Sequence, residues 1–345
     1  MRSSSHRPAP LRATAAGQPP VVPLTAARGH TGPALTYTAD RSGGRSLGTD
    51  AVVEVSRAPV VVGFDGSMAA LSAVHYGARE AQRRGSGLRI VHAFGWPVIL
   101  PPFHAPYDRH DLGPRAAMLD LLAQSAQDVQ AAHPHVPVTT RLIDGSPGAV
   151  LVDASGDAQL LVLGHRGLGG FAGLLVGSAA AQLTGHARCP VVVVRGDHPW
   201  DDGPVVLGTD GSPGANRAAE VAFEQAQLRD VELILAHHQP TGKSSAGAAV
   251  AGNPGFWATV GDPAAGGLGA GARYPDVKYR TEVVPGDSVA SALSAFAHRT
   301  SAGLLVVGSR GLGGFRGLVM GSTSRNLIEH ASCPVMVVPA VHDVD

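Results

Sequence analysis

Short runs of consecutive apolar residues recur along this chain, with helical or turn-forming sequence between them. An unbroken apolar run of about four to eight residues is typical of a strand that is buried on both faces of a parallel sheet. Residues 68–84 instead show the spacing of an amphipathic helix, and residues 115–132 are predicted to form a second helix. Strands and helices therefore alternate, which predicts an α/β fold. The predicted strands are 58–62, 88–94, 136–143, 160–163 and 190–194, and then 204–207, 231–237, 277–284, 304–307 and 334–338. Asp287, which follows the run 277–284, is predicted to cap the next helix.

The chain contains this arrangement twice. Residues 160–194 align without a gap with residues 304–338, and 22 of the 35 aligned positions are identical. Self-similarity of this extent indicates two copies of one structural unit. The sequence predicts two tandem Rossmann-like domains, 58–195 and 204–339, each with a five-stranded parallel sheet flanked by helices.

Residues 1–57 precede the first repeat and contain no acidic residue before Asp40. They are rich in Ser, Pro, Ala and Arg and lack helix or strand periodicity, so they are predicted to be a disordered extension. The composition is similar to that of an organelle transit peptide. Two alternatives to a transit peptide are an unstructured extension without a targeting role and a translation start placed too far upstream.

A glycine-rich loop follows the fourth apolar run of each repeat and leads into Gly-Ser at the start of a predicted helix. The loops span residues 164–178 and 308–322, and every glycine spacing in the first is kept in the second. Glycines let backbone N–H groups approach an anion closely, and a helix N-terminus adds a partial positive charge. An ordinary turn with a serine cap would use the same residues, but the repeated spacing favours a phosphate site.

Each first strand leads into an Asp-Gly-Ser sequence that begins with Asp65 or Asp210. Ligands of open parallel sheets bind beyond the carboxyl ends of the strands, so these carboxylates are expected to accept hydrogen bonds from a ligand. The alternative is an Asp-Gly turn whose serine caps the next helix. Both can hold, because the cap uses only the serine.

The spacing Gly, two residues, Gly, nine residues, Gly-Ser, found in both loops, resembles the ATP-binding signature of the universal stress protein family. The aspartate after strand one, the glycine after strand three and the closing His-Ala-x-Cys-Pro-Val are also similar to that family. The resemblance covers 58–195 and 204–339. It implies an adenine nucleotide alpha hydrolase-like fold, an intramolecular pseudo-dimer joined through the fifth strands, and an adenine nucleotide as partner. Further homodimerisation is left open.

The same resemblance implies a site for ATP, with or without Mg²⁺. The aspartates would lie at the adenine and ribose, and the loop glycines and serines would wrap the phosphates. The repeats differ near the adenine, at Ala93 and His238, and Ser324 provides a second serine where the first repeat has Ala180. The predicted site residues are Asp65, Ala93, Gly164, Arg166, Gly167, Gly177 and Ser178 in the first repeat, and Asp210, His238, Gly308, Arg310, Gly311, Gly321, Ser322 and Ser324 in the second.

The expected function is that of an ATP-binding stress-response regulator without a chemical step, since no general base and no paired carboxylates accompany the loops. No catalytic residue and no Walker lysine is found. Three alternatives stay open. One is a slow ATPase or adenylyl-transferring enzyme on the same fold, and another is a cyclic AMP binder, because adenine and one phosphate would use the same loop. The third is a dimerising scaffold without nucleotide, against which the intact signatures argue.

Composition excludes several other classes. The net charge of zero gives no basic field for nucleic acid, and no apolar run is long enough to span a membrane. Cys189 and Cys333 occupy equivalent positions and are expected to be small buried hydrophobes in a reducing cytoplasm. The histidine pairs, His133 with His135 and His237 with His238, lack the partners of a zinc site, so no metal site is expected.

Overall fold

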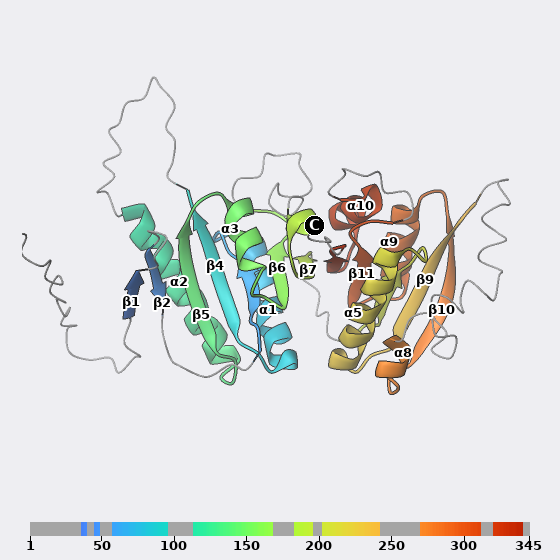
Figure 1. The fold of residues 1–345 in the computed structure, drawn as a ribbon, viewed down its shortest axis with the longest axis horizontal. Coiled ribbons are helices and arrows are strands. Elements are labelled where there is room, and N and C mark those ends of the chain that lie inside the picture. Colours follow the sequence, from blue (N-terminus) through green and yellow to red (C-terminus); the bar gives the residue numbers. More distant parts are fainter. Residues whose placement is uncertain are drawn as a thin grey trace, which may run out of the picture. The chain divides into compact units, whose positions relative to one another are not determined.

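Both repeats contribute to one ten-stranded sheet in the computed structural model of the chain (Figure 1). The structure describes residues 36–39, 45–48, 57–95, 113–167, 183–195, 202–241, 270–311 and 320–340. All of these belong to a single compact unit, Ala34–Asp345. The strand order is β10-β9-β8-β11-β12-β7-β6-β3-β4-β5, so each repeat occupies one half of the sheet.

The first repeat has five parallel strands in the order β5-β4-β3-β6-β7. Its central strands consist of fully buried aliphatic residues because helices cover both faces of the sheet. The elements are β3 (Val60–Gly63), α1 (Met68–Arg84), β4 (Leu88–Phe94), α2 (Gly113–Ala132), β5 (Val138–Asp144), α3 (Pro147–Ala154), β6 (Leu160–Gly164) and β7 (Val191–Val194).

The second repeat has the same order and the same parallel pairing, which confirms two five-stranded parallel domains. Of the glycine-rich segment between its second and third strands, residues 242–269 lie outside the described residues. The elements are β8 (Val205–Gly208), α5 (Pro213–Arg229), β9 (Leu233–Pro240), α8 (Ala270–Arg273), β10 (Tyr279–Gly286), α9 (Val289–Arg299), β11 (Leu304–Gly308), α10 (Ser322–His330) and β12 (Val335–Val338).

Helix starts follow the serine signals in the sequence, with one correction. Ser67 and Ser212 cap α1 and α5, and each Oγ accepts a hydrogen bond from the backbone N–H three residues later, at 3.1 and 3.2 Å. Asp287 was the predicted cap of α9, but the structure gives that role to Ser288, whose Oγ accepts from the N–H of Ser291 at 3.2 Å. Asp287 is instead the acceptor of a hydrogen bond from the Thr241 hydroxyl.

An antiparallel strand pair, β1 (Thr36–Ala39) with β2 (Arg45–Gly48), lies within the segment predicted to be disordered. The remaining residues of that segment up to 56 lie outside the described residues, and for them disorder stays a prediction. Within the described ranges, no helix combines the length and the hydropathy needed to cross a bilayer.

The two repeats join through their fifth strands, as the sequence resemblance implied. β7 and β12 pair antiparallel, with Val193 opposite Val335, Val192 opposite Met336 and Val191 opposite Val337. These side chains are fully buried. Each strand thereby covers an apolar edge that the other repeat would expose alone.

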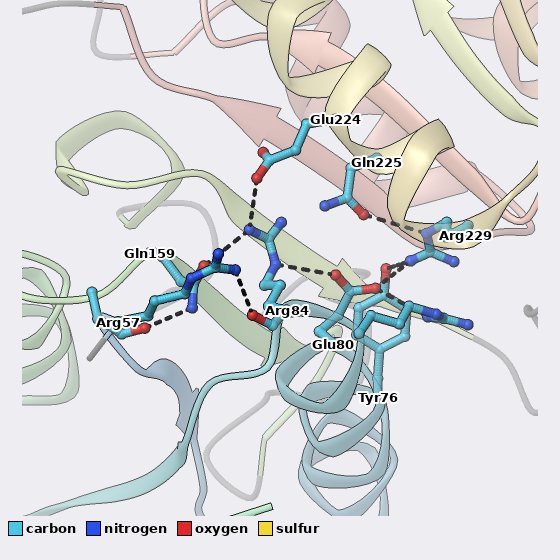
Figure 2. A network of polar contacts seen from close by, with 10 residues as sticks. Arg57, Tyr76, Glu80, Arg84, Gln159, Glu224, Gln225 and Arg229 are labelled. Atoms are coloured by element: carbon cyan, nitrogen blue, oxygen red, sulfur yellow. Dashed lines mark hydrogen bonds and ion pairs between the residues drawn. The ribbon is translucent and has the colours of Figure 1, made fainter. Parts of the chain in front are cut away.

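Helices α1 and α5 meet beside this strand pair through a buried polar network (Figure 2). The Arg229 guanidinium donates to the Glu80 carboxylate and to the Tyr76 hydroxyl, both at 2.6 Å. Glu80 also lies 3.5 Å from Arg84, which contacts Glu224 at 3.3 Å. Burial alone would raise the pKa of Glu80, but the guanidinium groups of Arg229 and Arg84 outweigh it and hold that pKa below its usual value.

Replacing Glu80 by Gln leaves the buried Arg229 guanidinium without its carboxylate. We expect the substitution to lower the free energy of unfolding by about 3–5 kcal/mol at pH 7. Because the folded-state pKa of Glu80 is depressed, its contribution is present above the unfolded pKa of about 4.3 and disappears as pH falls through the folded value. The difference between wild type and variant should therefore shrink in acid. Urea denaturation followed by circular dichroism measures both effects.

The control is Glu232→Gln, whose carboxylate pairs with Arg280 at 3.2 Å while 42% of its side chain is exposed. Exposed pairs of this kind contribute about 0.2–1 kcal/mol. Equal losses of stability in the two variants would show that the buried pair contributes no more than the exposed one.

The two cysteines are buried and free, as the sequence predicted. Burial raises the pKa of each thiol to about 12, so almost no thiolate exists at pH 8. We expect Ellman's reagent to label neither cysteine in the native protein and both in urea. Met68→Cys, at a side chain that is 77% exposed, is the control that should react at once. Rapid labelling of the native wild type would contradict the burial.

Candidate functional site

A cavity of about 540 Å³ opens at the carboxyl ends of β8 and β11, where the strand order of the second repeat reverses. This is the position at which open α/β sheets bind ligands. The cavity brings together all eight site residues predicted for this repeat. Its lining includes Asp210, His238, Gly308, Arg310, Gly311, Gly321, Ser322 and Ser324, with apolar walls from Ala236, Val289, Leu293, Val307 and Met320.

The carboxylate of Asp210 is fixed from two directions. Its Oδ1 accepts a hydrogen bond from the N–H of Ser212 at 3.0 Å. The intervening Gly211 has φ of 76°, a left-handed conformation that favours glycine. A Cβ placed on Gly311 would lie 2.4 Å from the other oxygen, Oδ2. The first glycine-loop turn after β11 therefore packs directly against this carboxylate.

The N-terminus of α10 forms another wall of the cavity. Gly321 is the N-cap, and no side chain caps the helix. Ser322, the first residue of α10, is exposed. Ser324 is buried and donates to the backbone carbonyl of Gly308 at 2.8 Å. Gly321 N–H donates to Ser309 O at 2.8 Å. These bonds hold the helix N-terminus, with its partial positive charge, against the end of β11.

Two adjacent histidines at the end of β9 have different roles. His237 Nδ1 lies 3.0 Å from the carbonyl oxygen of Thr209, the residue before Asp210. His92 makes the equivalent contact in the first repeat, at 2.7 Å from Phe64 O. The sequence reasoning missed this pair, although its repetition was visible. His238 was predicted as a site residue near the adenine, where the first repeat has Ala93. Its Nε2 lies 2.8 Å from Gly286 O, and its side chain lines the cavity.

The aspartate of the first repeat has the same contacts as Asp210. Asp65 Oδ1 accepts from the N–H of Ser67 at 3.0 Å, and a Cβ on Gly167 would lie 2.3 Å from Asp65 Oδ2. Arg166 lies beside this turn, with its carbonyl oxygen 3.5 Å from the Ser67 hydroxyl. Gly164 is packed more tightly than its counterpart Gly308, since a Cβ there would lie 2.6 Å from the backbone of Ala69.

Two predicted residues of the first site, Gly177 and Ser178, lie outside the described residues, as do residues 168–182 generally. Ala93, at the end of β4, is half-buried beside Ile143 of β5, in the register position that His238 and Val284 occupy in the second repeat. Ala93 and His238 thus differ in side chain at equivalent backbone positions of the two repeats.

Arg195, which the sequence reasoning did not select, connects the two repeats. It follows β7 directly, and its guanidinium donates to the carbonyl oxygens of Ile328, at 2.7 Å, and Glu329 at the C-terminal end of α10. Partial burial and the nearby Arg166 lower its pKa, while Glu329 opposes that shift. Its equivalent in the second repeat is Pro339, so comparison of the repeats would have marked it as a difference.

The arrangement suits binding of an anion by backbone N–H groups and hydroxyls. Among the described residues that line the cavity, Asp210 is the only carboxylate. No group of three or more His, Cys, Asp or Glu side chains within the described ranges could hold a metal ion. A single carboxylate that already accepts a backbone hydrogen bond is better suited to bind hydroxyl or amino groups than to activate water.

Sequence comparisons identify the family. The sequence profile described as the universal stress protein family matches residues 57–195 and 203–339. A universal stress protein of Mycobacterium tuberculosis (strain H37Rv) is 34% identical over 302 residues, which cover 81% of this chain and 94% of that protein.

Two solved structures extend the comparison. A universal stress protein from Archaeoglobus fulgidus is 20% identical, with a TM-score of 0.60 over 81% of this chain and 98% of its own. A universal stress protein in complex with cAMP is 27% identical and covers 40% of this chain and 97% of its own, with a TM-score of 0.30. The profile matches both repeats and so accounts for most of the chain, and the chain therefore belongs to the universal stress protein family.

Proposed function

We propose that this stress-response protein binds an adenine nucleotide, ATP in the first place, at the cavity of the second repeat and at the equivalent strand ends of the first, and that binding regulates the protein without a chemical step. The observation that carries the proposal is the convergence of Asp210, the glycine loop and the α10 N-terminus on one cavity of about 540 Å³. Small-molecule sites are roughly 300–1,000 Å³ in volume and mostly apolar, with few convergent polar groups.

The chemistry of the lining supports a specific orientation of the nucleotide. Asp210, beside the apolar wall of Ala236 and Leu293, would accept hydrogen bonds from the ribose or the adenine amino group. The exposed Ser322 hydroxyl, the N–H groups at the start of α10 and Arg310 would bind the phosphates. Mg²⁺ would rely mainly on phosphate oxygens and water, because the described lining offers one carboxylate.

Two alternative functions would use the same residues. Cyclic AMP would need the adenine pocket and one phosphate position. A slow ATPase would need a base to activate water. The described lining offers Asp210, which already accepts a backbone hydrogen bond, and His237 and His238, each with a ring nitrogen within 3.0 Å of a backbone carbonyl oxygen. The two free cysteines support a reducing compartment, and we place the protein in the cytoplasm.

The direct measurement is to denature freshly purified protein and identify and count the released nucleotide by chromatography. We expect one to two adenine nucleotides per chain. In calorimetric titrations, ATP should bind with a lower Kd than cyclic AMP. Gly321→Val should remove the nucleotide of the second repeat because its side chain projects over the phosphate position. Gly177→Val should do the same in the first repeat.

The matched control is Gly95→Val, since a Cβ at Gly95 meets no atom within 4 Å. No released nucleotide together with no heat on titration would leave the scaffold alternative. Phosphate release by wild type above the level of the Gly177→Val/Gly321→Val double variant would establish the ATPase alternative.

A second prediction concerns the contact between Gly311 and Asp210. Gly311→Ala places a methyl group where the carboxylate oxygen lies, 2.4 Å away, so the carboxylate must turn from its position. Loss of a hydrogen bond to a charged group costs about 1.5–3 kcal/mol, which is roughly a 10- to 100-fold weaker Kd for ATP. Calorimetry on a Gly177→Val background isolates the second site, and Gly95→Ala is the control. An unchanged Kd would exclude Asp210 from the nucleotide site.

A further inference from the structure

Helix α10, whose N-terminus borders the cavity of the second repeat, is short. It has nine residues, Ser322–His330. A helix of this length is only marginally stable by itself in water, so contacts with the rest of the protein have to fix its position. Ser324 makes one such contact inside the second repeat, with the carbonyl oxygen of Gly308. Two further contacts come from the first repeat.

One of these contacts lies just before the helix begins. The hydroxyl of Thr184, a fully buried residue of the first repeat, donates to the Sδ atom of Met320 at 2.9 Å. Met320 directly precedes the N-cap Gly321 and lines the cavity. A methionine side chain has three rotatable bonds and adapts easily to its surroundings. The hydrogen bond from Thr184 therefore restricts the positions that this part of the cavity wall can adopt.

The other contact lies at the opposite end of the helix. The Arg195 guanidinium donates to the carbonyl oxygens of Ile328, at 2.7 Å, and Glu329. Carbonyl groups in the last turn of a helix lack partners within the helix, and the helix dipole favours a cation beside them. The first repeat thus contacts the second repeat at both ends of α10.

These two contacts run in one direction. The gapless alignment of the repeats places Ile328 at the position of Thr184 and Pro339 at the position of Arg195. Neither of these side chains carries a hydrogen-bond donor. The second repeat therefore cannot return either contact to the first.

We propose, on the basis of the nucleotide function proposed above, that the first repeat completes the second candidate site. Thr184 and Arg195 are its positioning residues, because they hold α10 where its N-terminus can bind phosphate. Binding groups have to be held within about 0.5 Å of their productive geometry, and the N–H groups at the start of α10 move with the whole helix. The phosphate affinity of the second repeat is thereby coupled to the first repeat.

The first test measures ATP binding by calorimetry in the full chain, with every variant placed on the Gly177→Val background. Thr184→Val removes the hydroxyl with little change in volume, and Thr184→Ser keeps the hydroxyl. We expect Thr184→Val to raise the Kd for ATP about threefold or more, and Thr184→Ser to stay near the value of the background. An unchanged Kd in Thr184→Val would overturn the proposal.

The matched control for this variant is Thr139→Val. It removes another hydroxyl of the first repeat, which donates to the carbonyl oxygen of Leu88 at 3.5 Å within the same repeat, and it should leave the Kd unchanged. Adenosine, which has no phosphate, separates the positioning of α10 from a general loss of structure. Thr184→Val should weaken ATP binding more than adenosine binding, and equal weakening of the two ligands would contradict the positioning role.

Arg195→Met tests the other end of the helix, because it keeps the apolar stem and removes both hydrogen bonds to α10. We expect it to raise the Kd for ATP about fivefold or more, since the bonds that are lost come from a charged donor. The control is Arg188→Met. Arg188 is exposed, and its guanidinium lies 3.1 Å from the place of a Cβ on Gly156 of its own repeat. Equal Kd values in the two variants would exclude Arg195 from the positioning of α10.

A measurement without nucleotide separates this coupling from the nucleotide function itself. Amide hydrogen exchange at residues 325–331 reports the opening of α10. Exchange there should be about threefold or more faster in Arg195→Met than in Arg188→Met. Equal rates would overturn the proposal. Absence of ATP binding by the wild type would contradict the nucleotide function, and the exchange rates would still decide whether the first repeat holds α10.

Discussion

Two apolar strand edges that cannot remain exposed determine how this protein is built. β7 and β12 are valine-rich and fully buried, and each ends the sheet of its own repeat. Left open, such an edge would be a template for aggregation. Their antiparallel pairing closes both edges at once and turns two five-stranded sheets into one. The polar network between α1 and α5, and the contact of Arg195 with α10, exist only because this pairing brings the repeats together.

Most of the fold could be predicted because buried parallel strands and serine-capped helices leave strong local signals. The sequence also indicated which residues of the second repeat would meet at one cavity, since Asp210, Gly308 and Gly311 lie at strand ends that the topology brings together. Their part in binding a ligand stays a prediction. The sequence did not predict contacts between side chains that are distant along the chain. No local pattern indicates that Arg195 reaches Ile328 and Glu329, or that Glu80 meets Arg229. The cap of α9 was misplaced by one residue because Asp287 and Ser288 are both good capping residues.

The two candidate sites share a backbone and differ in side chains, which separates what the site requires from what it tolerates. The aspartate, the glycine against its carboxylate and the histidine behind it occur in both repeats with closely similar distances. His238 and Ser324 occur in the second repeat only, where the first has Ala93 and Ala180. The shared set is therefore the positioning framework, and the unshared set is where affinity or ligand choice can differ between the repeats.

Arg79 of α1 and Glu224 of α5 occupy equivalent positions in the two repeats, and their difference has a consequence for how such a protein can change over generations. In a homodimer encoded by one gene, every substitution appears in both subunits. Joining two copies in one chain removes that restriction, because the residues at positions 79 and 224 can be inherited independently. The tandem architecture thus permits the two sides of the junction to carry different charges, and it frees each candidate site to diverge separately.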